Sequence, residues 1–364
     1  MFDRPKALGS RVWSRAAPVV AAQARVTELL QRTTYDDATK AEILEQLEVL
    51  GLVRSDVGEF ALLRVLRGRL LVRHRDGTTE VVADGRADWV GFVELTTEPV
   101  TELATTHTAM VIRDVGADVL GVVEAESRPV LEMFSATLLR DVGWTPYDET
   151  LLLDGNDTRG IDVGILARGG HTVTALRSHI YDRDADGVVF SRDCAEYHLR
   201  TPGGERLVVL VNHFKSKGYS TPGDPLGVRR RRRQAVRVAQ IHDGLVAEGV
   251  EHIAVVGDLN DSPGSESLAP LLVDTSLRDI SEHPDFVWGP RRGTFGGGNE
   301  DEKIDYVLLS PALFARATGG GVNRSGVWRG PRTREPWDVY ETLVDEVDQA
   351  SDHAAIYADI DWSR

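Results

Sequence analysis

The hydrophobic pattern in the first part of the chain predicts a helix. Apolar residues recur there at helical spacing: Ile43, Leu44, Leu47 and Leu50. Asp36 or Asp37 is placed to cap the start of this helix, and Gly51 is placed to end it. We therefore expect a helix that begins after the two aspartates and ends before the glycine.

A β-hairpin is predicted directly after this helix. Residues 60–73 and 78–82 alternate between apolar and polar positions, as half-buried strands do. Between them stands Asp76-Gly77, a strong hairpin-turn signal. The two runs are therefore expected to pair with each other across this turn.

From residue 89 onward the pattern changes to short apolar runs separated by helical stretches and long loops. The runs have the length of buried strands: 119–123, 163–166, 207–211, 253–256 and 306–309. Helical stretches occupy residues 106–115 and 229–246. The mixture predicts an α/β fold of stacked sheets covered by helices. We expect residues 1–88 to form an N-terminal extension packed on a main domain of residues 89–364.

Polar residues with catalytic potential follow several of these apolar runs. Glu124 follows the first run, and Asn212 and His213 follow the third. Asp258 and Asn260 follow the fourth. Catalytic groups concentrate where rigid strands pass into loops. Taken singly, however, such residues are more often surface carboxylates, core histidines or turn residues.

The overall composition is that of an ordinary globular protein, with 41% hydrophobic and 27% charged residues. The single cysteine, Cys194, is compatible with a reducing compartment, so we expect a cytoplasmic protein. No run approaches the roughly 18 apolar residues of a membrane span, and we expect no membrane partner. The net charge of -15 weakens a nucleic-acid role without excluding it, because Lys and Arg supply most of that affinity. No protein partner is inferable.

The combined set of Asp, Asn, Glu and His residues, without cysteine, suits a hard cation such as Mg²⁺ or Mn²⁺. Phosphoryl chemistry uses such a set. The metal neutralises nonbridging oxygens, a carboxylate orients or deprotonates water, and an imidazole supports the phosphate or protonates the leaving oxygen. The sequence therefore favours metal-dependent chemistry on a phosphoester.

Six short motifs occur in the order seen in the endonuclease/exonuclease/phosphatase superfamily, which the chain resembles from about Trp89 to its C-terminus. The motifs are VLGVVE at 119–124, RGIDVG at 159–164, NHFKSK at 212–217, GDLND at 257–261, KIDY at 303–306 and SDH at 351–353. The resemblance implies a DNase-I-like four-layer sandwich, in which two packed mixed β-sheets are flanked by helices. It also implies hydrolysis of a phosphodiester.

The resemblance implies that Glu124 is the principal metal ligand and that Asp352 reaches the metal directly or through water. One position departs from the family. Its members place an asparagine ligand at the end of the first core strand, where this chain has Glu94. Either Glu94 replaces the asparagine as a ligand, which we favour because carboxylates bind hard cations, or this strand contributes no ligand.

The resemblance also assigns the catalytic roles. Asp258 and Asn260 would orient the attacking water and the phosphate. His353 would contact the phosphate and be held by Asp305, whose carboxylate favours the imidazolium form. His213 is the candidate general acid.

Three further residues are candidate contacts to the substrate phosphate: Arg159, Asn212 and Lys215. The alternatives are an ion-paired or surface arginine and a solvated lysine. Five consecutive arginines, residues 229–233, open the second predicted helix. They fit a solvated helix face better than a contact to a phosphate backbone.

Four aspartates have the spacing of a calcium-binding loop, with Asp in place of the final Glu: Asp182, Asp184, Asp186 and Asp193. Their flanks resemble strands and not the helices of an EF-hand. A polar hairpin loop is the plainer interpretation, and structural Ca²⁺ is the alternative.

We therefore expect a divalent-metal-dependent phosphodiester hydrolase, most simply a nuclease that acts on DNA or RNA. One alternative is a lipid or small-molecule phosphodiesterase or phosphatase on the same scaffold, which the acidic charge makes plausible. The other is a catalytically silent binding module, because the usual asparagine ligand is missing.

Overall fold

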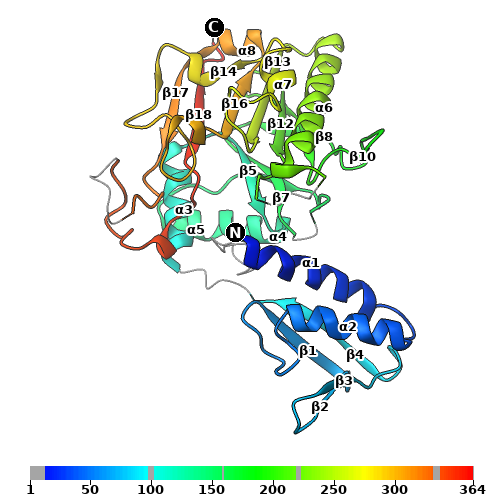
Figure 1. The fold of residues 1–364 in the computed structure, drawn as a ribbon. Helices are drawn as coiled ribbons and strands as arrows, with labels where there is room; N and C mark the ends of the chain where they lie inside the picture. Colours follow the sequence, from blue (N-terminus) through cyan, green and yellow to red (C-terminus); the bar gives the residue numbers. More distant parts are fainter. Residues whose placement is uncertain (1–12, 97–101, 158–159, 219–222, 331–336, 364) are drawn as a thin grey trace. The chain divides into compact units, whose positions relative to one another are not determined.

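The computed structural model describes residues 13–96, 102–157, 160–218, 223–330 and 337–363. The chain divides into two compact units, residues 2–99 and 100–364 (Figure 1). Within the described ranges, none of the helices combines the length and apolar character that crossing a bilayer requires.

Among its described residues, the smaller unit contains two helices and four strands: α1 (Trp13–Leu30), α2 (Asp37–Val49), β1 (Ala61–Gly68), β2 (Leu71–Arg73), β3 (Thr79–Val81) and β4 (Trp89–Leu95). The predicted helix is confirmed as α2. Asp36 caps it by accepting a hydrogen bond from the Thr39 backbone N–H at 2.8 Å. Ile43 and Leu47 are fully buried in the core of this unit.

The predicted hairpin is confirmed in part. Strands β2 and β3 pair antiparallel on either side of Gly77, whose φ of +91° suits a glycine. The first predicted run, however, divides into β1 and β2, and β1 pairs antiparallel with β4. The strand that we expected to begin the main domain therefore belongs to the smaller unit, and the expected boundary between residues 88 and 89 falls inside that unit.

The larger unit contains the remaining strands: β5 (Val119–Ala125), β6 (Glu149–Leu152), β7 (Asp162–Ala167), β8 (Thr172–Arg177), β9 (Arg183–Asp184), β10 (Gly187–Val188), β11 (Cys194–Arg200), β12 (Arg206–His213), β13 (His252–Asp258), β14 (Arg278–Asp279), β15 (Phe286–Val287), β16 (Asp305–Leu309), β17 (Ala317–Asn323) and β18 (Ala355–Ile360). The five predicted strands are confirmed as β5, β7, β12, β13 and β16; four of them are largely buried, whereas most residues of β5 are only partly buried.

The helices of this unit are α3 (Glu102–Val115), α4 (Arg128–Ala136), α5 (Leu138–Asp141), α6 (Val228–Ala247), α7 (Ala269–Leu272) and α8 (Pro311–Ala315). Short 3-10 helices are η2 (Pro225–Gly227), η3 (Ile280–Glu282), η4 (Glu300–Glu302) and η5 (Glu346–Asp348). The two predicted helical stretches are confirmed as α3 and α6.

The predicted layered sandwich is confirmed (Figure 1). One layer is a six-stranded mixed sheet of order β14-β16-β13-β12-β11-β8, and the facing layer consists of the three-stranded sheets β5-β7-β6 and β15-β17-β18. Buried residues such as Ile165 of β7 and Val209 of β12 form the core between the layers. The other face of the six-stranded sheet packs on α6 through residues such as Leu210 and Val238, and α4 packs against β5 and β6.

The strand order brings predicted site residues to one edge of the six-stranded sheet. In the parallel pair β12–β13, His213 lies opposite Asp258, and in the antiparallel pair β13–β16, Asp258 lies opposite Asp305. Gly257 permits the close approach of β12 and β13. Its φ is +124°, and a Cβ atom there would lie 2.0 Å from the Asn212 carbonyl oxygen. A side chain at this position would therefore push β12 and β13 apart.

Candidate active site

Side chains from separate strands and loops converge where β12, β13 and β16 meet. Ligand atoms of Asp258, Asp305 and His353 all lie within 4.8 Å of one another. These residues are up to 95 positions apart in sequence, so the sheet order and the loop before β18 bring them together. The cluster contains two carboxylates and one imidazole.

The Asp305 carboxylate holds the His353 ring by accepting a hydrogen bond from its Nδ1. The distances from Nδ1 to the two carboxylate oxygens are 2.9 and 3.0 Å. Burial opposes the charged imidazole, but the charges of Asp305, Asp258 and Asp352, together with the hydrogen bond to Asp305, outweigh it and raise the pKa of His353 well above its usual value. The Phe295 ring lies against the imidazole, with 4.8 Å between centroids. His353 is therefore oriented and held as imidazolium.

Asp258 and Asn260 form a second pair beside this histidine. The Asn260 amide donates to Asp258 Oδ2 at 2.8 Å, and its backbone N–H donates to Oδ1 at 2.7 Å. Burial, followed by the charges of Asp305 and Glu124, raises the pKa of Asp258 to about 7 against the opposing charge of His353. A carboxyl with this pKa can exchange a proton near neutral pH.

Two of the predicted site residues have left-handed backbone conformations. The φ of Glu124 is +59° and that of Asn260 is +57°. The pairing of β5 with β7 shifts register between Val123 and Ala125, so Glu124 is the extra residue of a β-bulge. Such conformations cost about 1–3 kcal/mol each and concentrate at functional sites. The bulge redirects Glu124 at the end of its strand.

His213 lies beside Asp258, with its Nε2 3.5 Å from Asp258 Oδ2. Asn212 does not share this position. Neighbouring residues of a strand face opposite sides of the sheet, and Asn212 is fully buried with its amide donating to the Leu210 carbonyl. The expected contact between Asn212 and a substrate phosphate is therefore not supported by its position.

Three further residues were expected to bind the metal or the phosphate: Glu94, Asp352 and Arg159. Glu94 lies in the smaller unit, where it forms an ion pair with Arg64 at 2.6 Å. The Asp352 side chain is exposed and its charge acts on His353. Metal ligation by Glu94 and Asp352 stays a prediction. Arg159 lies outside the described residues.

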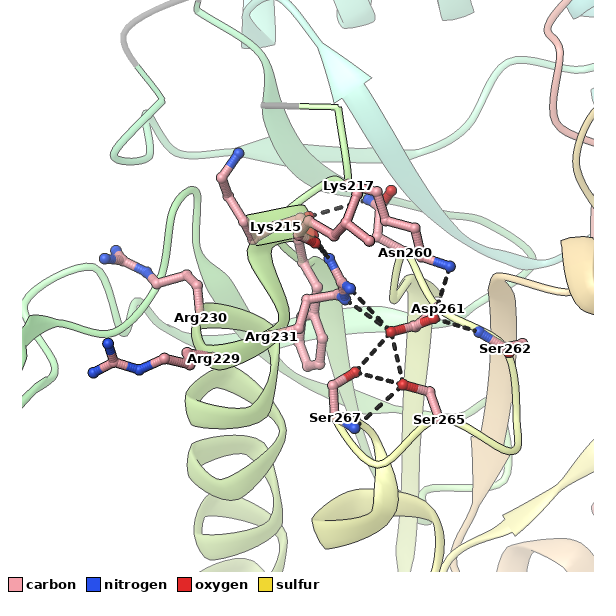
Figure 2. Close-up of polar contacts among 12 residues, drawn as sticks. Lys215, Lys217, Arg229, Arg230, Arg231, Asn260, Asp261, Ser262, Ser265 and Ser267 are labelled. Atoms are coloured by element: carbon pink, nitrogen blue, oxygen red, sulfur yellow. Dashed lines mark hydrogen bonds and ion pairs between the residues drawn. The ribbon is translucent and has the colours of Figure 1, made fainter. Parts of the chain in front are cut away.

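A buried network that the sequence did not predict supports the Asp258–Asn260 loop (Figure 2). The fully buried Arg231 of α6 donates to Asp261 Oδ2 from Nε and Nη2, at 3.1 and 3.0 Å. Asp261 also accepts from Ser265 and Ser267, and its Oδ1 lies 2.8 Å from the Lys217 ammonium. The run of arginines marked this helix, but the run alone did not indicate which arginine points inward.

A second unpredicted set of contacts fixes Asp305. The hydroxyl of Thr294, which is almost fully buried, accepts from the backbone N–H groups of Ile304 and Asp305, both at 3.1 Å. Lys303 is also buried, and its ammonium donates to Asp279 at 2.6 Å and to the Asp305 carbonyl at 3.4 Å. The lysine of the KIDY motif therefore supports the loop that carries Asp305.

Three of the aspartates with the spacing of a calcium loop form ion pairs with arginines of α6. They pair with arginines at successive turns of this helix: Asp186 with Arg229, Asp184 with Arg233 and Asp182 with Arg237. Asp193 is buried and accepts from the His179 backbone N–H at 2.8 Å. Within the described ranges, the four aspartates do not converge on one point. The plainer interpretation, a polar hairpin, therefore agrees with the structure.

Sequence and fold comparisons agree on the identity of this fold. The family described as the Endonuclease/Exonuclease/phosphatase family matches residues 79–284, more than half of the chain. The chain is similar in fold to a mannosyl-6-phosphatase from Bacteroides thetaiotaomicron VPI-5482, with a TM-score of 0.52, 15% identity, and coverage of 71% of this chain and 91% of that chain.

A second structure of similar fold is an endonuclease/exonuclease/phosphatase from Bacteroides vulgatus, with a TM-score of 0.50, 15% identity, and coverage of 71% of this chain and 91% of that chain. No curated protein matches the chain in sequence. The family match and the convergence of the motif residues lead to one conclusion: this chain belongs to the endonuclease/exonuclease/phosphatase family of phosphoester hydrolases.

Proposed function

We propose that this protein is a divalent-metal-dependent phosphodiester hydrolase that acts on nucleic acid. The observation that carries the proposal is the convergence of Asp258, Asp305 and His353 at one sheet edge. Two carboxylates with an imidazolium suit a reaction in which water attacks a phosphorus atom and an oxyanion leaves. A phosphoester is the substrate class common to the family.

The residues of the site fit a hard divalent cation. Glu124 and Asp305 both raise the pKa of Asp258, which means that the carboxylates repel one another and that a cation would stabilise them. Glu124 is the main ligand in our assignment, with Asp352 as a further one. When bound, Mg²⁺ or Mn²⁺ neutralises charge on the nonbridging phosphate oxygens.

The side chains of this chain then have separate roles. Asp258, held by Asn260, accepts a proton from the attacking water. His353, held by Asp305, donates to the phosphate and stabilises its growing negative charge. His213 lies beside Asp258 and protonates the leaving oxygen. Each role requires the group to be fixed before the substrate arrives, and the hydrogen bonds to Asp258 and His353 provide that fixation.

Positive charge near the site favours nucleic acid as the substrate class. The protein carries a net charge of -15, yet two lysines, Lys215 and Lys217, follow His213 closely, and of these Lys217 is already paired with Asp261. A local basic patch can attract a polyanion to an otherwise acidic protein. The rival is a lipid or small-molecule phosphodiesterase or phosphatase on the same scaffold.

A substrate panel tests this proposal. Single-stranded DNA, duplex DNA, RNA, bis-p-nitrophenyl phosphate, p-nitrophenyl phosphate and sphingomyelin vesicles would each be assayed with Mg²⁺, Mn²⁺, Ca²⁺ or EDTA. We expect hydrolysis of at least one nucleic acid and of the chromogenic diester with Mg²⁺ or Mn²⁺, and none in EDTA. Hydrolysis of the monoester or the lipid alone would favour the rival, and no hydrolysis of any substrate would favour a silent binding module.

A further inference from the structure

The run of arginines at the start of α6 contains one member unlike the others. Four of the five donate to protein acceptors: Arg229 to Asp186, Arg231 to Asp261, Arg232 to the Glu266 carbonyl and Arg233 to Asp184. Within the described parts of the chain, Arg230 forms no ion pair, and its Nε is buried without a hydrogen-bond acceptor. Arg230 is therefore the arginine of this run that is left to bind something else.

The surroundings of Arg230 do not favour a lone positive charge. Burial, followed by repulsion from Arg233, lowers the pKa of the Arg230 guanidinium, although Asp184 and Asp224 partly compensate. A buried guanidinium donor without an acceptor costs free energy, which a bound anion would recover through charge-assisted hydrogen bonds. Guanidinium groups bind phosphates especially well because two N–H groups can donate to two oxygens.

Arg230 is held close to the catalytic loops by its neighbours on α6. The Lys215 backbone N–H donates to Gln234 Oε1 at 2.9 Å, and the Lys215 carbonyl accepts from Arg231 Nη1 at 2.9 Å. The preceding residue, Phe214, accepts at its carbonyl from the Asn260 amide at 3.1 Å. A continuous set of hydrogen bonds therefore joins the first turns of α6 to the catalytic Asn260.

The Lys215 side chain lies on the same part of this surface. It runs over Gly227, where an added Cβ atom would lie 2.9 Å from Lys215 Cγ, and Gly227 precedes Arg230 by one helical turn. Figure 2 shows that Arg231 points towards Asp261, whereas Lys215 and Arg230 extend away from the Asp261 network. The two cationic side chains therefore flank the start of α6 together.

We propose that Arg230, with Lys215 beside it, binds a non-scissile phosphate of a nucleic-acid substrate. The inference rests on the proposed function and deepens it, because a polynucleotide has further phosphates beside the one that is cleaved. A sugar monophosphate has no second phosphate. A choline lipid presents one phosphate and a quaternary ammonium group, which Arg230 would repel.

The test compares Arg230→Gln with Arg232→Gln. Arg232 lies on the same helix and is exposed, so its substitution changes the net charge equally without touching the proposed subsite. We expect Arg230→Gln to raise KM for a single-stranded oligonucleotide about tenfold with little change in kcat, and to lower the salt dependence of binding by about one counterion. Neither variant should change kcat/KM for bis-p-nitrophenyl phosphate, which has no second phosphate. Arg230→Lys should restore part of the affinity.

Binding is also measured without turnover, by fluorescence anisotropy of a labelled oligonucleotide in EDTA. Weaker binding by Arg230→Gln than by Arg232→Gln would support the subsite, and equal binding by the two variants would overturn it. Because this measurement needs no catalysis, it judges Arg230 even if the native protein hydrolyses no diester, an outcome that would contradict the proposed function. Circular dichroism of each variant confirms that it is folded.

Discussion

The imidazole of His353 donates from Nδ1 into the carboxylate of Asp305, at 2.9 and 3.0 Å from its two oxygens. The two residues come from different segments, since Asp305 begins β16 and His353 precedes β18. The Thr294 hydroxyl and the Lys303 ammonium bind the backbone N–H and the backbone carbonyl of Asp305, so the backbone that carries the carboxylate is fixed. The pairing of Asp305 with His353 fixes the orientation and the positive charge of His353.

Replacing Asp305 by asparagine should impair catalysis through His353. Asp305→Asn keeps the size of the side chain but removes its charge, so the imidazolium form loses its partner. We expect kcat to fall by about 10²–10⁴, as for the loss of a general acid–base group, and the His353 pKa to fall as well. Steady-state kinetics and NMR titration of the imidazole in metal-free protein would measure both. Asp301→Asn, at an exposed position nearby, is the control, and an Asp305→Asn enzyme with native kcat would contradict the assignment.

Glu94 and Glu124 should differ in their effect on metal affinity. The ion pair with Arg64 and the pairing of β4 with β1 now favour the interpretation in which the first strand contributes no ligand. Glu124→Gln should weaken Mn²⁺ binding about tenfold or more, whereas Glu94→Gln should leave it unchanged. Calorimetric titration of both variants would show this. Weaker binding by Glu94→Gln, with rescue by excess metal, would restore Glu94 as a ligand.

The protein should lose stability in acid, because protonation of Asp261 removes the charge that its network stabilises. Burial alone would raise its pKa, but hydrogen bonds from Lys217, Ser265 and Ser267 and the charge of Arg231 hold the pKa well below its usual value. A depressed carboxyl pKa gives stability that is fully present above about pH 4 and is lost as the pH falls below it.

Asp261→Asn should therefore lower the free energy of unfolding at pH 7 by about 3 kcal/mol, because Arg231 is left buried without its partner. Its stability should also depend less on pH below about pH 4. Urea unfolding across pH 3 to 7 measures both effects, with the exposed Glu266→Gln as the control. An unchanged unfolding free energy at pH 7 would show that the network contributes little.

The β9–β10 hairpin should not bind calcium. Because Asp184 already pairs with Arg233, a cation would have to displace the guanidinium. We expect Asp184→Asn to leave the affinity and stoichiometry of Ca²⁺ binding unchanged in calorimetric titration. Loss of one binding site in this variant would restore the calcium loop.

The sequence predicted the strands of the larger unit well because buried strands are continuous apolar runs whatever their partners. It did not predict which strands pair. Residues 89–95 have the pattern of a core strand, and nothing in the run itself indicates that it pairs with β1. Pairing depends on tertiary contacts that a local pattern does not contain.

The sequence pattern also does not indicate which single residues face the site. Asn212 and His213 are neighbours at the end of a strand that is buried on both faces, so the alternation of apolar residues does not indicate which of them faces the site. Arg231 is indistinguishable in sequence from Arg230 and Arg232, and only the direction of each side chain on α6 separates buried support from exposed charge.

The central claim is that His353 acts on a phosphodiester in a metal-dependent reaction. The most direct measurement is the rate of bis-p-nitrophenyl phosphate hydrolysis by the native protein and by His353→Ala in Mn²⁺ and in EDTA, with near-ultraviolet circular dichroism as the folding control. The account predicts native activity that EDTA abolishes and a loss of at least about a hundredfold in kcat for the folded variant. Near-native turnover by folded His353→Ala, or native activity that persists in EDTA, would contradict it.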